Sequence, residues 1–272
     1  MMISRQAQPA TVHRVVVLVL PGALPLDVGI PAQVFRQKYG APYEVLLAGE
    51  HAGPVPASEP FHYLVEHGVE AFKTAGTIVV PGYSDTDQEP SSVVLEALRA
   101  AHNRGVRIAS VCTGAFALAA AGLLDDRRAA THWKAADTLA ARYPLIRVDR
   151  DVLFVDEEQI LTSAGVAAGI DLCLHMIRRD HGSHLAAEVA RHIVAAPYRE
   201  GGQAQFIPRP LPEGIGRLFA RTRAWALERL ETPLTVADMA AHAHVSYRTF
   251  TRRFVEDTGL PALQWLLRAR VD

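Results

Sequence analysis

The first two thirds of the chain alternate short apolar runs with stretches of helical periodicity. The runs at 14–20 (RVVVLVL) and 77–80 (TIVV) are continuous and β-branched, which is typical of strands buried on both faces of a parallel sheet. The stretches 26–39 and 91–103 carry apolar residues at helical spacing. This alternation predicts a doubly wound α/β fold with a mostly parallel, flavodoxin-like sheet. Further strands are expected at 43–48 and 106–111, further helices at 114–124, 134–142 and 169–178, and a hairpin-like pair near Arg147 and Phe154.

Residues 214–272 carry only helical patterns. A helix over 214–230 would place Ile215, Leu218, Phe219 and Trp225 on one face. Thr235, with Asp238 three residues on, resembles a capping box that opens a short helix through His242. After a brief turn, Ser246 is expected to cap a third helix. Two short helices joined by such a turn form a helix-turn-helix pattern, so we expect a small all-α domain here.

The third helix has two distinct faces. Phe250 and Phe254 are spaced to lie inward, while Arg248, Thr251 and Arg252 fall on a single polar stripe. If this helix enters the major groove of DNA, these three side chains would meet base edges. Tyr247 and Arg253 would contact phosphates, which position a protein without specifying sequence. A solvated arginine face on a small helical bundle is the alternative.

Composition indicates the domain boundaries and the cellular location. Four prolines and a glycine pair mark a linker at 194–213, between an α/β domain at 14–193 and the helical domain at 214–272, and residues 1–13 lack periodicity, as in a disordered leader. Apolar runs are too short to cross a membrane and no signal pattern precedes them, which favours a soluble cytoplasmic protein. From residue 204 onward, ten arginines face seven acidic residues, a mild asymmetry that suggests an anionic partner.

A cysteine stands where the strand at 106–111 meets the next helix. Such a strand-turn-helix elbow exposes its central side chain towards the helix N-terminus, so the Cys112 thiol is expected to ionise more readily than a free one. Asp27 and Gly82 also follow strands and would gather at the same sheet edge. A ligand pocket is therefore predicted from Asp27, Gly82, Cys112, Thr113 and His132.

Three interpretations of this pocket stay open. In the first, Cys112 is a nucleophile, Asp27 accepts or orients a proton, and backbone N–H groups near Gly82 and Thr113 stabilise an oxyanion. In the second the pocket senses a small effector or an oxidant. In the third the elbow is inherited and silent. His132 is a further catalytic candidate, although no partner that would orient it is evident.

No metal or cofactor is predicted. The two cysteines, Cys112 and Cys173, form no metal-binding spacing and no disulfide framework, and Cys173 lies within an apolar helix as a core residue would. His181 and His184 lack further ligands at a recognisable spacing. The polar stretch 83–92 lacks the spacing of a calcium loop and is interpreted as solvated.

Several motifs together resemble the GlxA-type transcriptional regulators of the AraC/XylS superfamily. The first domain resembles the PfpI/ThiJ branch of the class I glutamine amidotransferase-like fold, and the second resembles an AraC-type DNA-binding domain. The motifs are Leu26-Asp27-Val28, Val80-Pro81-Gly82, Val111-Cys112-Thr113-Gly114, Thr131-His132-Trp133, the linker stretch 199–206 and the helical stretches around Leu234, Arg248 and Arg252.

This resemblance implies a homodimeric transcription regulator that binds DNA and an unknown small effector. It also implies a second helix-turn-helix after a joining helix near Pro261, and the chain reaches Asp272 within that helix. Asp27 with Cys112-Thr113 resembles isocyanide hydratases as well, so a cysteine-dependent lyase is the alternative function. Tyr83 departs from the family pattern, because many relatives carry a second glycine there, which puts the oxyanion site in doubt.

Overall fold

The computed structural model describes residues 12–40, 42–58, 60–203, 205 and 218–270, and the chain forms two compact units, 1–207 and 208–272. Residues 1–11 of the expected leader, and 204 and 206–213 of the expected linker, lie outside the described residues. Among the helices described, none is both long and apolar enough to cross a membrane.

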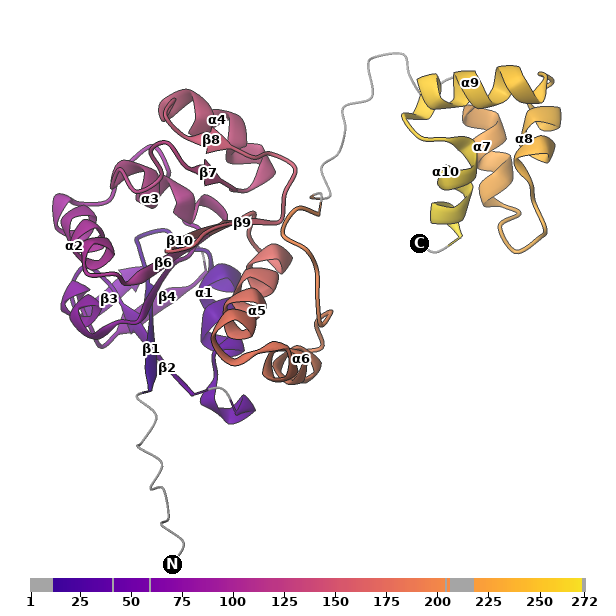
Figure 1. The fold of residues 1–272 in the computed structure, drawn as a ribbon. Coiled ribbons are helices and arrows are strands. Elements are labelled where there is room, and N and C mark those ends of the chain that lie inside the picture. Colours follow the sequence, from indigo (N-terminus) through magenta and orange to yellow (C-terminus); the bar gives the residue numbers. More distant parts are fainter. Residues whose placement is uncertain (1–11, 41, 59, 204, 206–217, 271–272) are drawn as a thin grey trace, which may run out of the picture. The chain divides into compact units, whose positions relative to one another are not determined.

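A six-stranded sheet forms the centre of the first unit (Figure 1). Its order is β2-β1-β5-β6-β10-β9, parallel throughout except for β9, which pairs antiparallel with β10. This confirms the mostly parallel, doubly wound α/β fold. The strands are β1 (His13–Leu18), β2 (Tyr43–Ala48), β5 (Thr77–Val80), β6 (Arg107–Val111), β9 (Phe154–Glu157) and β10 (Ile160–Ser163).

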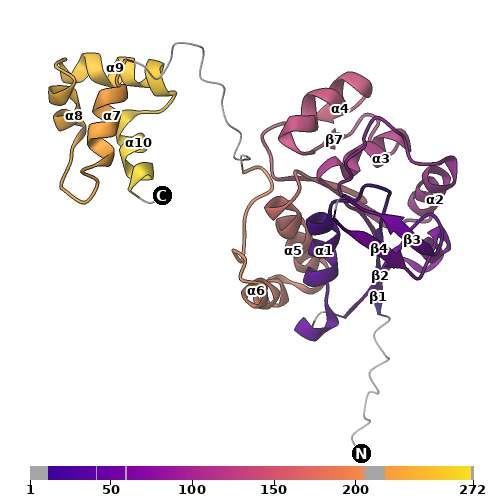
Figure 2. The same ribbon diagram turned by 180° about the vertical axis from the view of Figure 1, so that it is seen from behind.

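Helices cover both faces of this sheet (Figures 1 and 2). One face packs its alternate strand residues, such as Val16, Ile78 and Ile108, against α2 and α3; the other packs Val15, Val79 and Ala109 against α1, α5 and α6. The helices are α1 (Pro25–Val34), α2 (Ser92–Asn103), α3 (Ala115–Ala120), α4 (Ala136–Arg142), α5 (Ala167–His181) and α6 (Ser183–His192), with 3₁₀ turns at Gln37–Tyr39, Val69–Thr74, Cys112–Gly114 and Trp133–Ala135.

Two pairings differ from the sequence prediction. The stretches near Arg147 and Phe154 do not pair with each other: β8 (Arg147–Val148) pairs with β7 (Arg128–Ala129), and β9 pairs with β10. The turn between β9 and β10 is polar and is held by Asp156, whose Oδ1 accepts the Glu158 N–H at 2.8 Å. This local bond explains why the hairpin forms one strand later than predicted.

A two-stranded hairpin, β3 (Gly53–Pro56) with β4 (His62–Val65), was not predicted. Pro54 and Pro56 argue against a strand, because proline cannot donate to a ladder. The hairpin tolerates them because, among the described strands, β3 forms a ladder with β4 alone. The predicted helix at 26–39 is also wrong in its second half. It ends at Val34, where Phe35 turns inward and packs edge-on against Tyr43 with ring centroids 4.8 Å apart.

The second unit is a small helical bundle, α7 (Ala220–Leu227), α8 (Val236–His242), α9 (Tyr247–Thr258) and α10 (Ala262–Ala269). Its core includes Phe219, Met239, Phe250, Phe254 and Leu266. The Thr235–Asp238 capping box and the Ser246 cap form as predicted. The first helix of this unit starts at Ala220, later than predicted, so Leu218 and Phe219 precede it. Of the face predicted for this helix, Phe219 is buried and Leu218 is exposed, and Ile215 lies outside the described residues.

Candidate functional site

Cys112 occupies a sharp elbow at the end of β6. Its φ of 58° lies in the left-handed region, which a side chain other than glycine adopts only under strain. Glycines leave room for this turn: a Cβ on Gly165 would lie 3.0 Å from the Cys112 Sγ, and a Cβ on Gly82 would lie 3.0 Å from the Cys112 Cβ. The predicted strand-turn-helix elbow is therefore present, and its surroundings are tightly closed.

The Cys112 thiol is not activated, contrary to the sequence prediction. Only 5% of the residue is exposed, and burial, followed by the negative charge of Asp27, raises its pKa to about 12. Interactions with Thr113 act in the opposite direction but do not offset burial. The helix N-terminus alone suggested a low pKa, whereas removal from water favours the neutral thiol.

Asp27 enters the elbow from α1 and is 1% exposed. Its Oδ1 accepts the Val166 N–H at 3.2 Å, while Oδ2 is buried without a hydrogen bond of normal geometry. Burial raises the Asp27 pKa, although the nearby Val166 and Gly82 N–H groups and the Cys112 thiol favour its ionised form. Cys112 and Asp27 thus face each other with both groups biased towards their neutral forms.

The Thr113 hydroxyl is fully engaged with the backbone of Tyr83. It accepts the Tyr83 N–H at 2.9 Å and donates to the Tyr83 carbonyl at 2.8 Å. The N–H that follows Gly82 is therefore already bonded, which removes one potential donor from the oxyanion site. Thr113 acts here as a clamp between the elbow and the loop after β5.

His132 lies close enough to the elbow for the charge of Asp27 to act on it. Its Nδ1 accepts the Lys134 N–H at 3.3 Å, and its ring stacks on Trp133. Burial and Lys134 lower the His132 pKa, while the charge of Asp27 raises it. The preceding Thr131 donates its hydroxyl to the Cys112 carbonyl at 2.9 Å, so this segment is fastened to the elbow.

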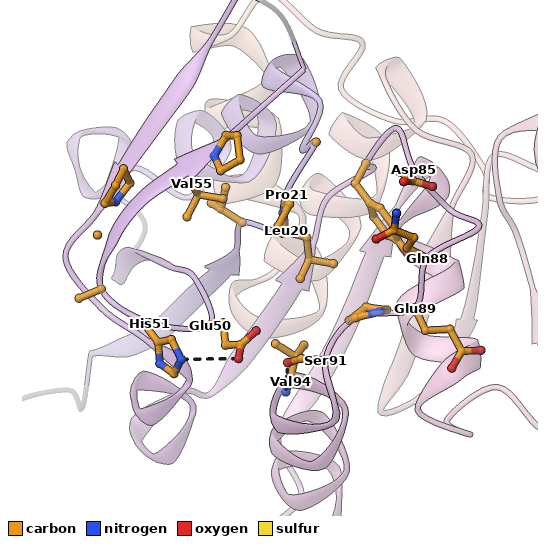
Figure 3. A pocket seen from close by; sticks show the side chains of 18 residues that line it. Leu20, Pro21, Glu50, His51, Val55, Asp85, Gln88, Glu89, Ser91 and Val94 are labelled. Atoms are coloured by element: carbon orange, nitrogen blue, oxygen red, sulfur yellow. Dashed lines mark hydrogen bonds and ion pairs between the residues drawn. The ribbon is translucent and has the colours of Figure 1, made fainter.

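Beside the elbow lies a larger cavity of about 640 Å³. Three segments that follow β1, β2 and β5 surround it (Figure 3). Tyr83 belongs to both sites: its backbone bonds Thr113, and it also lines the cavity. Sequence reasoning missed this cavity, because the unpredicted β3–β4 hairpin forms one wall and the loop at 83–92 was interpreted as merely solvated.

Residues 197–203 and 205, which we call the strap, pack on the first unit although the sequence assigned them to the linker. Arg199 donates two hydrogen bonds to the buried carboxylate of Asp171, from Nε to Oδ1 and from Nη2 to Oδ2. The Gly201 carbonyl accepts the N–H groups of Leu153 and Phe154 at 2.7 and 3.2 Å.

The side-chain amide of Gln205 contacts three backbone carbonyls in two segments. The Gln205 Nε2 lies within hydrogen-bond distance of the carbonyls of Thr131, Arg150 and Val152, at 3.3, 3.0 and 3.0 Å. Because Thr131 bonds the Cys112 carbonyl, this one residue links the elbow to the end of the strap.

In the second unit, α8 and α9 are joined by a short turn, and α9 presents the predicted polar stripe. Arg248 and Arg252 are exposed, with Arg252 also bonded to Glu256 at 3.2 Å. Tyr247 and Arg253 are exposed as well. The Thr251 hydroxyl turns back to the carbonyls of Tyr247 and Arg248, which leaves its methyl group as the freer contact. Phe250 and Phe254 are fully buried, which fixes the opposite face.

No group of three or more His, Cys, Asp or Glu side chains in the described part of the chain is placed to hold a metal ion. Cys173 is fully buried between α5 and the sheet, which confirms it as a core residue.

The sequence profile of the DJ-1/PfpI family matches residues 13–179, which include the elbow and all six strands of the central sheet. The chain belongs to the DJ-1/PfpI family. The predicted PfpI/ThiJ relationship is thus confirmed. Among solved structures, an AraC family transcriptional regulator from Pseudomonas putida has the same fold over 66% of this chain and 99% of its own, with a TM-score of 0.60 and 20% identity.

Relatives of this family member include regulators. It is 29% identical over 225 residues to the HTH-type transcriptional regulator CdhR of Pseudomonas aeruginosa, covering 82% of this chain and 67% of CdhR. It is 34% identical over 185 residues to the HTH-type transcriptional regulator GlxA of Rhizobium meliloti, covering 66% of this chain and 56% of GlxA. The chain therefore spans between about half and two thirds of these regulators.

An enzyme is also related. Isonitrile hydratase of Pseudomonas putida is 31% identical over 215 residues, covering 75% of this chain and 91% of the enzyme. The same α/β unit thus occurs both in regulators and in an enzyme.

Proposed function

We propose that this chain acts in transcription regulation, with a DNA-binding second unit and a first unit that binds a small effector and forms a homodimer in the cytoplasm. The observation that carries this proposal is the exposed stripe of α9. It follows a short turn from α8, is held rigid by Phe250 and Phe254 beneath it, and carries Arg248 and Arg252. The regulator names of CdhR and GlxA support the same conclusion.

Each arginine has an assigned role. Arg248 and Arg252 reach base edges, where an arginine bound to guanine discriminates by about 1–3 kcal/mol. Arg253 and Tyr247 contact phosphates on either side. Thr251 contributes its methyl group, since its hydroxyl is bonded to its own helix.

The test is capture of fragmented genomic DNA by the full chain at two salt concentrations, followed by sequencing. We expect a shared motif whose enrichment falls with salt, because phosphate contacts release counterions. Arg248→Ala and Arg252→Ala should lose the motif, and Arg253→Ala should weaken all fragments alike. Arg191→Ala removes one exposed charge from α6 and serves as the matched control. Equal capture of all fragments by every variant would refute sequence-specific binding.

The homodimer is proposed from exposed apolar side chains of the first unit. Leu26 on α1 and Leu64 on β4 are 59% and 78% exposed, and the two elements meet where the Tyr63 hydroxyl donates to the Pro25 carbonyl. A two-fold dimer would bury them and place two reading helices on one DNA site. Light scattering should give the mass of a dimer for the parent protein. Leu64→Glu should give the mass of a monomer, whereas Val93→Glu on α2 should keep the mass of the dimer.

Isocyanide hydration is the second candidate, since Asp27 faces Cys112 and isonitrile hydratase is a relative. The buried neutral thiol and the engaged Thr113 hydroxyl argue against it. We expect no formamide above background from an aliphatic isocyanide. Turnover that Cys112→Ser abolishes would instead establish the enzyme.

A further inference from the structure

The cavity beside the elbow has a floor of apolar side chains. Val19, Leu20, Val55 and Val94 line it, each at most 8% exposed, together with Tyr83. They come from four separate segments: the end of β1, the hairpin, the loop after β5 and the start of α2 (Figure 3). These residues belong to the packed core, so the floor is preformed. A preformed apolar cavity of this size suits a small organic molecule.

The rim of the cavity is acidic. Glu50, Asp85 and Glu89 line it, and no lysine or arginine occurs among the described residues that do so. His51 lies 3.5 Å from Glu50 and offsets that charge only when protonated. Glu89 is paired from outside the cavity by Arg142 at 3.2 Å and accepts the Tyr143 hydroxyl at 3.1 Å. Glu50 and Asp85 therefore dominate the charge that an entering molecule meets.

These carboxylates do not form a metal site. They are spread around the rim (Figure 3), and no group of three acidic or metal-binding side chains in the described parts of the chain is close enough to hold a metal ion. Dispersed negative charge over an apolar floor is instead complementary to a molecule that carries one positive charge on an apolar body. Tyr83 also lines the cavity.

We propose that this cavity binds a small organic cation, with its ammonium or guanidinium group attracted by the acidic rim that includes Glu50 and Asp85 and its apolar part on the floor of Val19, Val55 and Val94. The site is distinct from the Cys112 elbow. As the effector site it rests on the regulatory function proposed above, whereas binding of the cation does not.

Tyr83 provides the connection between this site and the elbow. A molecule on the cavity floor contacts Tyr83, whose N–H and carbonyl are both held by the Thr113 hydroxyl next to Cys112.

Calorimetry with the full chain and matched probes tests the proposal. We use hexylammonium, hexylguanidinium, hexanoate and 1-hexanol, which share one apolar chain and differ in charge. Both cations should bind, and hexanoate and hexanol should bind roughly tenfold more weakly or not at all, as expected where two carboxylates attract one positive charge. The preference should shrink with added salt, because the rim is exposed.

Rim variants locate the binding. Glu50→Gln and Asp85→Asn should each weaken the cations about two- to fivefold and leave hexanol unchanged. Glu96→Gln removes an exposed carboxylate of α2 that does not line the cavity, and it should change nothing. Because these side chains lie at the surface, all three variants should keep the melting temperature of the parent.

The outcomes separate the two proposals. Equal binding of hexylammonium and hexanol, or cation binding that ignores Glu50→Gln and Asp85→Asn, overturns the cation site. Cation binding that depends on the rim supports the site even if genomic capture fails, and in that case the regulatory role alone is refuted. Cation binding that also changes the affinity for captured DNA supports both.

Discussion

At the scale of single residues, the elbow shows how burial outweighs local dipoles. Cys112 follows a strand and precedes a helix, as its neighbours in the sequence indicate. The degree of burial around it depends on Gly82, Gly165 and Asp27, which approach from distant positions. That Asp27, Gly82 and Cys112 lie close together could thus be predicted, but the raised pKa of the Cys112 thiol could not.

The rate of alkylation measures how readily the Cys112 thiol ionises. With its pKa raised to about 12 by burial, Cys112 should react with iodoacetamide at neutral pH at least about tenfold more slowly than a free cysteine. Asp27→Asn should speed the reaction, since the charge of Asp27 contributes to that shift. Peptide mass spectrometry follows Cys112, with the fully buried Cys173 as internal control. Rapid labelling of Cys112 in the parent protein would contradict the buried neutral thiol.

At the scale of elements, the sequence predicted what depends on local periodicity. The buried runs of β1 and β5, and the caps of α8 and α9, stand where predicted. The β3–β4 hairpin was missed because its prolines are tolerated only where a strand has one neighbour, which is a property of the assembled sheet. Because the hairpin was not predicted, one wall of the cavity was not predicted either.

The cap of α9 is testable by itself. The Ser246 hydroxyl accepts the Thr249 N–H at 3.2 Å, so Ser246→Ala should lower the free energy of unfolding of the second unit by about 1 kcal/mol. Ser246→Gly is the matched control, because glycine is tolerated at this position and costs only a few tenths of a kcal/mol. Urea unfolding is followed by tryptophan fluorescence in a Trp133→Phe background, because Trp133 belongs to the first unit and the two remaining tryptophans, Trp225 and Trp265, both belong to the second. Equal losses in both variants would show that the hydroxyl does not stabilise the helix.

At the scale of the whole molecule, histidines make stability depend on pH. Burial lowers the pKa of His13, His102 and His132 below the usual value, so the unfolded chain takes up protons first as the pH falls. The contribution of these neutral histidines to the stability of the fold is fully present above about pH 6.5. It is lost as the pH falls through their pKa values in the folded protein.

The urea midpoint of unfolding should therefore fall between pH 7 and pH 5. The free energy of unfolding falls over this range by at most about 1.4 kcal/mol per pH unit for each proton taken up. His102→Gln should flatten this dependence, because the His102 Nδ1 is buried without a hydrogen bond. His184→Gln, at a side chain 87% exposed, should leave it unchanged. A midpoint independent of pH in the parent would contradict the assignment.

The strap also belongs to this scale. A Cβ on Gly201 would lie 2.7 Å from the Phe154 carbonyl oxygen, so Gly201→Ala should displace the strap, whereas Gly202→Ala meets open space. Hydrogen exchange of the Leu153 and Phe154 N–H groups, which bond the Gly201 carbonyl, should accelerate at least about tenfold in the first variant only. Unchanged exchange would show that the strap tolerates the extra methyl group.

The docked strap also sets the length of the covalent tether between the two units. The tether starts at Gln205, thirteen residues beyond His192 at the end of α6, so roughly 43–47 Å of extended chain is taken out of its maximum span. A shorter tether raises the local concentration of one unit around anything bound to the other. Residues inserted between α6 and the strap would form a longer surface loop. Residues inserted after Gln205 would lengthen the tether itself.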